Sequence, residues 1–324
     1  MIPYSRQHVN ESDIAAVVDV LRGDWLTTGP VVDRFEEGVA KYVGAAYAVA
    51  FSSATAALHS ACAAAGLGPG DLVATSPLTF IASANCARYV GAQPTLIDID
   101  LSTLNLDVNR VDESLEALIP VHYAGLPVDL SALQTRPRVI IEDASHALGA
   151  HTLEGPIGNC HRSDMCVFSF HPVKPITTGE GGMVTTNNGE LADRLRQFRS
   201  HGIVRPPSAT SWKYDVRELG FNYRMTDIQA ALGLSQLGRI GEFIDRRNAL
   251  ADRYRELLAD MPVVLPPAAP TGTRHGYHLF AVQVADRDRV FVAMRKAGIG
   301  VQVHYIPVHQ HSISKDITLP AEGF

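Results

Sequence analysis

Residues 168–186, FSFHPVKPITTGEGGMVTT, place a single lysine in a loop between two short apolar runs. This lysine, Lys174, lies between Pro172 and Pro175, and no acidic residue follows it until Glu180. A lysine near the end of a buried strand can act as a Schiff-base amine when burial lowers its pKa. Most lysines simply face water, so the loop alone leaves both interpretations open.

Around this loop, short apolar runs alternate with segments of helical pattern, which is typical of βαβ units and a parallel sheet. We therefore expect an α/β fold with a mostly parallel central sheet flanked by helices. Gly66 is placed to end the first helix that follows a strand. Strands are predicted within residues 46–51, 71–76, 94–100, 117–123, 138–144, 165–170 and 181–187, and helices within 54–68, 79–91 and about 228–261.

The length of the chain predicts more than one domain. A chain of 324 residues exceeds the size at which a single core usually stops growing. We expect a large domain over residues 11–240 and a smaller C-terminal α/β domain over residues 241–324, with residues 1–10 packing near the smaller one. Within the smaller domain, residues 277–284 and 290–308 show a strand, helix, strand pattern.

Composition excludes several classes of function. The formal net charge of −6 offers no general field for a polyanion, so no nucleic-acid partner is expected. The four cysteines form no C-x-x-C pair and are expected to be reduced. The amino terminus shows no secretory pattern, and no apolar run is long enough to span a membrane. We expect a soluble, cytoplasmic protein with no membrane partner.

Ligands of open parallel sheets bind beyond the carboxyl ends of the strands, and four of these ends are informative, including the one that leads into the Lys174 loop. SSATAA (52–57) combines small residues, including Thr55, with a helix start whose free N–H groups favour a phosphate. Asp143 stands at the tip of a buried strand, where a carboxylate needs a cation. Phe80 stands at the start of another helix and offers a stacking face. The respective alternatives are an ordinary helix cap for SSATAA, a structural salt bridge or a helix cap for Asp143, and core packing for Phe80.

Together these features match the needs of pyridoxal 5'-phosphate. The phosphate needs a helix terminus, the ring nitrogen needs an acidic partner, and the aldehyde needs an amine. The residues therefore predict a pyridoxal phosphate site in which Lys174 supplies the amine. The histidines of HYIPVHQH (304–311) do not predict zinc, because no cysteine or acidic ligand accompanies them, and no metal is expected.

Several motifs, in the same order along the chain, resemble those of the DegT/StrS-type sugar aminotransferases. That family comprises fold-type-I pyridoxal phosphate enzymes that act on nucleotide-linked keto sugars. The resemblance runs from near residue 3 to about residue 311, and the smaller domain is expected to be incomplete because it fades from Ser312 onward. The motifs are SSATAALHSA (52–61), IEDASHALGA (141–150), FSFHPVKPITTGEGG (168–182), ELGFNYRMTDIQAALG (218–233) and GIGVQVHYIPVH (298–309).

The resemblance implies a role for each matching residue. Lys174 would bind the cofactor and shuttle a proton, and Asp143 would pair with the pyridine nitrogen. The other implied cofactor contacts are Ala54, Thr55 and Ser169 for the phosphate, Phe80 for stacking, His146 for the ring hydroxyl and Asn222 for the phosphate of the neighbouring subunit. The implied substrate contacts are Thr28, Arg224, His304 and Tyr305, although Arg224 equally suits a structural ion pair.

These roles imply a homodimer with shared active sites. The phosphate turn departs from the family pattern, because Ser53 and Ala54 stand where Asn-Gly is usual. The implied reaction transfers the amino group of L-glutamate to the C4 ketone of a UDP-linked 4-keto-6-deoxy-N-acetylhexosamine, as in pseudaminic acid synthesis. Two alternatives stay open: a different nucleotide keto sugar, such as a 3-keto or GDP-linked one, and a non-catalytic sensor that binds the cofactor. A dehydratase is disfavoured by Lys174, since a histidine replaces the lysine in that branch.

Overall fold

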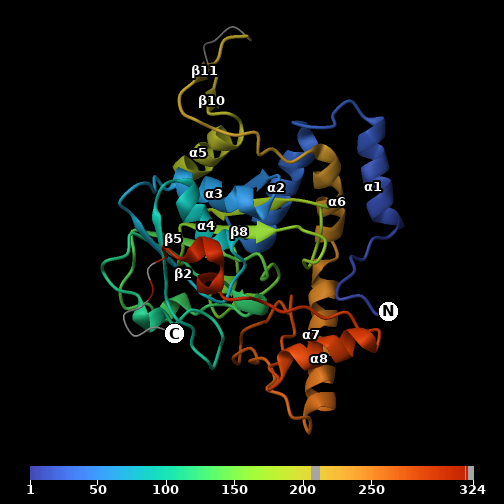
Figure 1. Cartoon of the computed structure of the whole chain (residues 1–324). Coiled ribbons are helices and arrows are strands. Elements are labelled where there is room, and N and C mark those ends of the chain that lie inside the picture. Colours follow the sequence, from blue (N-terminus) through green and yellow to red (C-terminus); the bar gives the residue numbers. More distant parts are fainter. Residues whose placement is uncertain (206–211, 318, 320–324) are drawn as a thin grey trace.

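The computed structural model describes residues 1–205, 212–317 and 319 (Figure 1). In this part of the chain the central sheet has seven strands, and each overlaps one of the predicted runs. The strands are β1 (Tyr47–Phe51), β2 (Leu72–Thr75), β3 (Gln93–Leu96), β4 (Ala117–Ile119), β5 (Val139–Asp143), β8 (Met165–Ser169) and β9 (Gly182–Thr186).

The order of these strands is β1-β9-β8-β5-β4-β2-β3, and of them β9 alone runs antiparallel to its neighbours. The predicted mostly parallel sheet is therefore confirmed. Strand pairing places Asp143 opposite Val167 and Ser169 opposite Gly182. The carboxyl ends of β5 and β8 and the start of β9 consequently meet at one edge of the sheet, where ligands of such sheets bind.

Helices cover both faces of the sheet (Figure 1). Because alternate strand residues face opposite sides, Val49 and Phe51 belong to one core, and Ala48 and Ala50 belong to the other. Burying a side chain such as Phe51 contributes roughly 1.5–3 kcal/mol. The first core packs against α3 (Ala54–Ala64), α4 (Ala82–Tyr89) and α5 (Gly189–Arg199), and the second against α2 (Pro30–Val43) and α6 (Asp227–Leu237).

Helix α3 begins and ends as the sequence predicts. The Ser53 side chain accepts a hydrogen bond from the Ala56 N–H at 3.1 Å, which caps the helix. Gly66 follows the last turn in the left-handed conformation, with a φ of +71°, and its N–H donates to the Ala63 carbonyl. The predicted capping role of Gly66 is confirmed, because a glycine adopts this φ without steric cost.

The long helix predicted from about residue 228 is two helices. Helix α6 begins at a capping box formed by Thr226 and Gln229, and α7 (Ile240–Leu258) starts after a break at Gly238 and Arg239. The Arg239 guanidinium forms an ion pair with Asp13, which is buried on α1 (Glu11–Arg22). This ion pair joins α1 to the start of α7.

The C-terminal part forms α8 (Arg287–Lys296) as predicted, but the expected flanking strands are isolated bridges in the described residues. Val264 bridges Gln283, and Ile2 bridges Ile299. Strands need several hydrogen-bonded neighbours to be stable, and here each segment has one short pairing. The Ile2 N–H donates to the Gly298 carbonyl at 2.7 Å, so the amino-terminal residues lie beside this part of the chain.

The remaining elements are short. The sequence predicts that the smaller domain is incomplete from Ser312 onward; residues 312–317 and 319 of this stretch are described, and residues 318 and 320–324 lie outside the described part. The division into domains stays a prediction. Within the described ranges, no helix is both long and apolar enough to cross a membrane. The short elements are the hairpins β6 (His151–Thr152) with β7 (Gly155–Pro156) and β10 (Ile203–Val204) with β11 (Asp215–Val216), and the 3-10 turns Val108–Arg110, Tyr123–Gly125, Leu130–Ala132, Val308–Gln310 and Ser312–Ser314.

Candidate active site

A cavity of about 320 Å³ opens at the edge where β5, β8 and β9 meet. This volume is within the range of small-ligand pockets, about 300–1,000 Å³. Nine of the predicted site residues line the cavity, although they come from distant parts of the sequence. They are Ala54, Thr55, Phe80, Asp143, His146, Ser169, Lys174, His304 and Tyr305.

Lys174 lies in the loop after β8, which turns back through a hydrogen bond from the Lys174 N–H to the His171 carbonyl at 2.9 Å. Burial lowers the pKa of its ammonium from 10.5 to about 8, while the charge of Asp143 acts in the opposite direction. The ammonium makes no hydrogen bond or ion pair with any described residue. Lys174 is therefore an amine that is partly uncharged near neutral pH and free to react.

Asp143 ends β5 and is buried beside the cavity. Its carboxylate accepts hydrogen bonds from the Ser83 hydroxyl at 2.7 Å and from the Ser145 N–H at 3.1 Å. No described lysine, arginine or histidine forms an ion pair with it, so the structural salt bridge considered from the sequence is absent there. A buried carboxylate with two neutral donors and no paired cation fits a protonated ring nitrogen.

The start of α3 supplies an anion site. The first N–H groups of a helix have no intrahelical partner, and here they belong to Ala54 and Thr55 on the cavity wall. Ser53 caps the helix, so the ordinary helix cap considered as an alternative is also present. The cap accepts its hydrogen bond from the Ala56 N–H, which leaves the N–H groups of Ala54 and Thr55 available. The Ser169 hydroxyl joins them from the end of β8.

Gly182 allows β9 to pass close to residues 53 and 54, the turn that leads into α3. A Cβ atom at residue 182 would lie 2.5 Å from the Ala54 nitrogen, a distance that real contacts do not show. The second glycine of the GG pair therefore lets the strand run directly beside the anion site, because any larger residue would displace the turn.

Phe80 and the histidines form the remaining wall. The Phe80 side chain is 58% exposed and lies 6.2 Å from the Tyr305 ring, which excludes the core-packing alternative. The His146 Nε2 atom and the Tyr305 hydroxyl are hydrogen-bonded at 3.0 Å. Burial holds the pKa of His146 well below its usual value, so His146 is neutral. The wall thus presents neutral hydrogen-bonding groups and one exposed aromatic face.

His304 is held at the rim of the cavity. Its Nε2 atom is hydrogen-bonded to the Tyr4 hydroxyl at 2.8 Å, and the two rings stack at 5.2 Å. The Tyr123 hydroxyl donates to the His304 carbonyl at 2.6 Å. Among the residues described, no three His, Cys, Asp or Glu side chains gather in a way that could hold a metal ion.

Thr28, Asn222 and Arg224 do not line this cavity. Asn222 is exposed, and the Thr28 hydroxyl donates to the carbonyl of the preceding residue at 2.7 Å. Arg224 has no ion pair with the described acidic residues. Thr27 bridges Thr226, which brings Thr28 next to the segment that carries the other two. The roles implied for these three residues therefore stay predictions.

Three residues of the site were not found from the sequence. Ser83 holds Asp143, Tyr4 holds His304, and the His278 ring lies 4.4 Å from the His146 ring inside the cavity wall. Ser83 follows Phe80 by three residues, but Ser83 is buried whereas Phe80 is exposed, so this spacing does not mark it. Tyr4 and His278 lie far from the cavity strands in the sequence, and no local pattern marks them.

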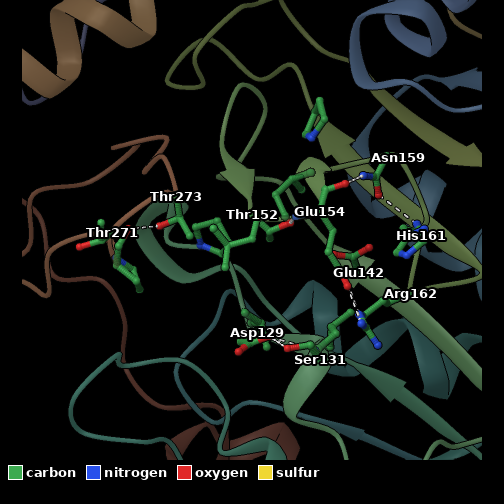
Figure 2. Close-up of a pocket in the computed structure, with 17 residues that line it drawn as sticks. Asp129, Ser131, Glu142, Thr152, Glu154, Asn159, His161, Arg162, Thr271 and Thr273 are labelled. Carbon is green, nitrogen blue, oxygen red and sulfur yellow. Dashed lines mark hydrogen bonds and ion pairs between the residues drawn. The ribbon is translucent and has the colours of Figure 1, made fainter.

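A second cavity, of about 360 Å³, lies on another part of the surface, between residues 127–131, the β6–β7 hairpin and residues 270–273 (Figure 2). Glu142 reaches it because neighbouring residues of a strand face opposite sides. The Glu142 carboxylate is already satisfied by Ser163 at 2.5 Å and His122 at 2.8 Å, and Glu154 pairs with Arg162 at the rim. No predicted site residue lines this cavity, so the chemistry is placed in the first one.

Comparison with known proteins finds relatives that are similar to this chain in sequence and in fold. The chain is 38% identical to the UDP-4-amino-4-deoxy-L-arabinose–oxoglutarate aminotransferase of Shewanella sediminis, covering 95% of this chain and 84% of that protein. A structure of Helicobacter pylori PseC, an aminotransferase involved in the biosynthesis of pseudoaminic acid, matches with a TM-score of 0.90 at 30% identity, covering 99% of this chain and 90% of the other.

A putative sugar aminotransferase from Streptococcus pneumoniae in its PMP form also has a TM-score of 0.90 at 30% identity, with 98% of this chain and 88% of that chain covered. That protein is known in a PLP form too. The fold-type-I class, the transaminase activity and the family's dependence on pyridoxal phosphate are thus confirmed. The model of the DegT/DnrJ/EryC1/StrS aminotransferase family matches residues 7–322, and the chain belongs to that family.

Proposed function

We propose that this sugar aminotransferase transfers the amino group of L-glutamate to the C4 ketone of a UDP-linked 4-keto-6-deoxy-N-acetylhexosamine, in pseudaminic-acid-type synthesis. The observation that carries the transaminase chemistry is the cavity that joins Lys174 and Asp143 to an anion site at the start of α3. The similarity to PseC supports the choice of sugar, and the similarity to the Shewanella enzyme supports a UDP-linked substrate and a glutamate-type donor.

The residues of the cavity fit pyridoxal phosphate. Lys174 would hold the aldehyde carbon, Asp143 the protonated ring nitrogen, and Ala54, Thr55 and Ser169 the phosphate. When bound, the cofactor supplies an electron sink for the negative charge at the carbon that loses its proton. Asp143 favours this by holding a proton on the ring nitrogen, and Ser83 fixes the direction of the carboxylate by its hydrogen bond.

Lys174 would also move the proton. Its Nζ atom must be uncharged to accept a proton from the α-carbon of glutamate, and a pKa of about 8 leaves a fraction of the amine uncharged near neutral pH, where an ordinary lysine is almost fully charged. The exposed ring of Phe80 offers a stacking face, and His146 with Tyr305 offers hydrogen bonds to a ring hydroxyl. The second half of the reaction uses the same residues in reverse, with the sugar ketone as acceptor.

We further propose that the site is completed by a second copy of the chain. Asn222 and Arg224 belong to an extended segment that follows the β10–β11 hairpin, which projects from the body of the molecule (Figure 1). Large apolar side chains are exposed along this region, including Trp212, Tyr214 and Leu219. Aromatic residues and arginines are enriched at interfaces, and a two-fold dimer would exchange these segments reciprocally.

The substrate is tested with a panel of UDP- and GDP-linked 4-keto and 3-keto sugars, each assayed with L-glutamate for 2-oxoglutarate release and amino-sugar formation. The UDP-linked 4-keto-6-deoxy-N-acetylhexosamine should give the highest kcat/KM. Preference for a 3-keto or GDP-linked sugar would overturn the choice of substrate but retain the aminotransferase. Failure of every sugar, together with no glutamate-driven change in the bound cofactor, would favour a cofactor-binding sensor.

A further inference from the structure

Helix α3 carries a buried histidine, His59, which follows Thr55 by one helical turn. Its ring lies among aromatic side chains from other parts of the chain. The ring centroids are 5.3 Å away for Tyr89, 5.1 Å for Phe198, 5.1 Å for Phe221 and 5.9 Å for Tyr223. We call these five residues the His59 cluster.

The cluster holds the segment 221–224 from one side. Phe221 and Tyr223 stack on each other at 4.9 Å, and the Tyr223 hydroxyl is hydrogen-bonded to the His59 Nδ1 atom at 3.1 Å. Side chains of an extended segment alternate in direction, and Asn222 is exposed. Asn222 and Arg224 are therefore on the opposite side from His59, facing away from this subunit's core.

Backbone hydrogen bonds tie the same segment to the rest of the subunit. The Phe221 N–H donates to the Phe198 carbonyl at 2.8 Å, and the Tyr223 N–H donates to the Arg199 carbonyl at 3.0 Å. The Ser52 N–H, just before the phosphate turn, donates to the Tyr223 carbonyl at 2.7 Å. The direction of Asn222 is consequently set by contacts with α5 and α3, and His59 provides the side-chain contact from α3.

We propose that His59 is a positioning residue for the active site of the neighbouring subunit rather than for its own. This inference rests on the proposed dimer, in which Asn222 and Arg224 reach the neighbouring site. One end of α3 would hold the subunit's own cofactor phosphate, while His59 on the same helix fixes the segment offered to the partner. Loss of the histidine should loosen that segment and weaken cofactor binding across the interface.

The test starts from three variants. His59→Leu removes the ring contacts and the hydrogen bond, and His59→Phe removes the hydrogen bond while retaining a ring. Tyr89→Phe is the matched control, because it removes a hydroxyl from the same cluster without touching the bond to Tyr223. The apparent Kd for pyridoxal phosphate, from the visible absorbance of the Lys174-bound cofactor, should rise about tenfold in His59→Leu, the loss expected for one hydrogen bond to a phosphate. Tyr89→Phe should bind as the wild type does.

Mixed dimers then decide in which site the loss appears. When His59→Leu subunits are exchanged with Lys174→Ala subunits, only the His59→Leu subunit can form the absorbing bond to the cofactor. The segment that completes this site comes from the Lys174→Ala subunit, whose His59 is intact. The proposal predicts a wild-type Kd in the mixed dimer. A Kd as weak as that of the His59→Leu homodimer would show that His59 acts on its own site, and would overturn the inference; His59→Phe repeats the test if His59→Leu does not fold.

A parallel exchange separates this inference from the proposed dimer. Mixed dimers of Asn222→Ala with Lys174→Ala should also recover a wild-type Kd. If the Asn222→Ala mixture recovers and the His59→Leu mixture does not, the shared site stands and the role of His59 is refuted. If neither recovers despite proven subunit exchange, the shared site is refuted, and the role of His59 falls with it.

Discussion

Replacing Lys174 by a neutral residue should make the apoenzyme more stable, because the fold pays to keep this amine buried. Burial lowers the pKa of Lys174 from 10.5 to about 8. The difference corresponds to about 3 kcal/mol of unfolding free energy, since one pKa unit is worth about 1.4 kcal/mol. We therefore expect Lys174→Met to raise the unfolding free energy of the apoenzyme by up to about 3 kcal/mol near pH 6.5.

The sign of this effect fixes its pH dependence. A lysine whose pKa is lower in the folded state than in the unfolded state destabilises the fold most at a pH at which the amine is protonated in both states. For Lys174 this is below about pH 8. The penalty fades as the pH rises from about 8 toward 10.5, because the folded state has lost its proton there while the unfolded state still holds one, so that unfolding takes up a proton and becomes less favourable. The advantage of Lys174→Met should therefore shrink steadily over this range.

The assay is urea unfolding of cofactor-free protein at pH 6.5, 8.5 and 10, at one fixed protein concentration, because a dimer's stability depends on concentration. Lys41→Met is the control, since Lys41 is an exposed lysine in the last turn of α2. Equal stability of Lys174→Met and the wild type at pH 6.5, or a gain that does not change with pH, would refute the inferred burial of the charged amine.

Two further predictions concern the cofactor's ring and phosphate. Asp143→Asn should retain cofactor bound by its phosphate but slow the glutamate half-reaction by orders of magnitude in stopped-flow absorbance, since an unprotonated ring is a poor electron sink; near-normal rates would make Asp143 merely structural. Gly182→Ala should weaken cofactor binding at least tenfold by equilibrium titration, because its Cβ would meet the Ala54 nitrogen at 2.5 Å, whereas Gly241→Ala, with no atom within 4 Å, should not. Equal affinities for the two variants would mean that the turn tolerates the added methyl group.

The strands of the sheet and several residues of the cavity could be predicted from the sequence for a physical reason. Strands buried on both faces read as short apolar runs, and their carboxyl ends share one edge, so Asp143 and Ser169 could be placed together without a structure. Gly66 could be placed because a helix end needs a left-handed residue. These features depend on neighbours within a few residues.

The rest depends on contacts between distant segments. The pairing of Arg239 with Asp13, beside the break between α6 and α7, is a contact that no helical pattern shows. His278 enters the cavity wall by packing on His146, more than a hundred residues earlier in the chain. The strands expected beside α8 are isolated bridges because their partners are short segments. Thr28, Asn222 and Arg224 lie outside the cavity of this chain, and their predicted roles stay predictions.

The most direct test of the account is borohydride reduction of the cofactor-loaded enzyme, followed by peptide mapping. The account predicts loss of the visible absorbance and a stable pyridoxyl label on Lys174, in the peptide that spans FSFHPVKPITTGEGG. Lys174→Arg should remain folded, take no label and have no turnover. A label on any other lysine, or an active Lys174→Arg enzyme, would contradict the assignment of this cavity as the catalytic centre.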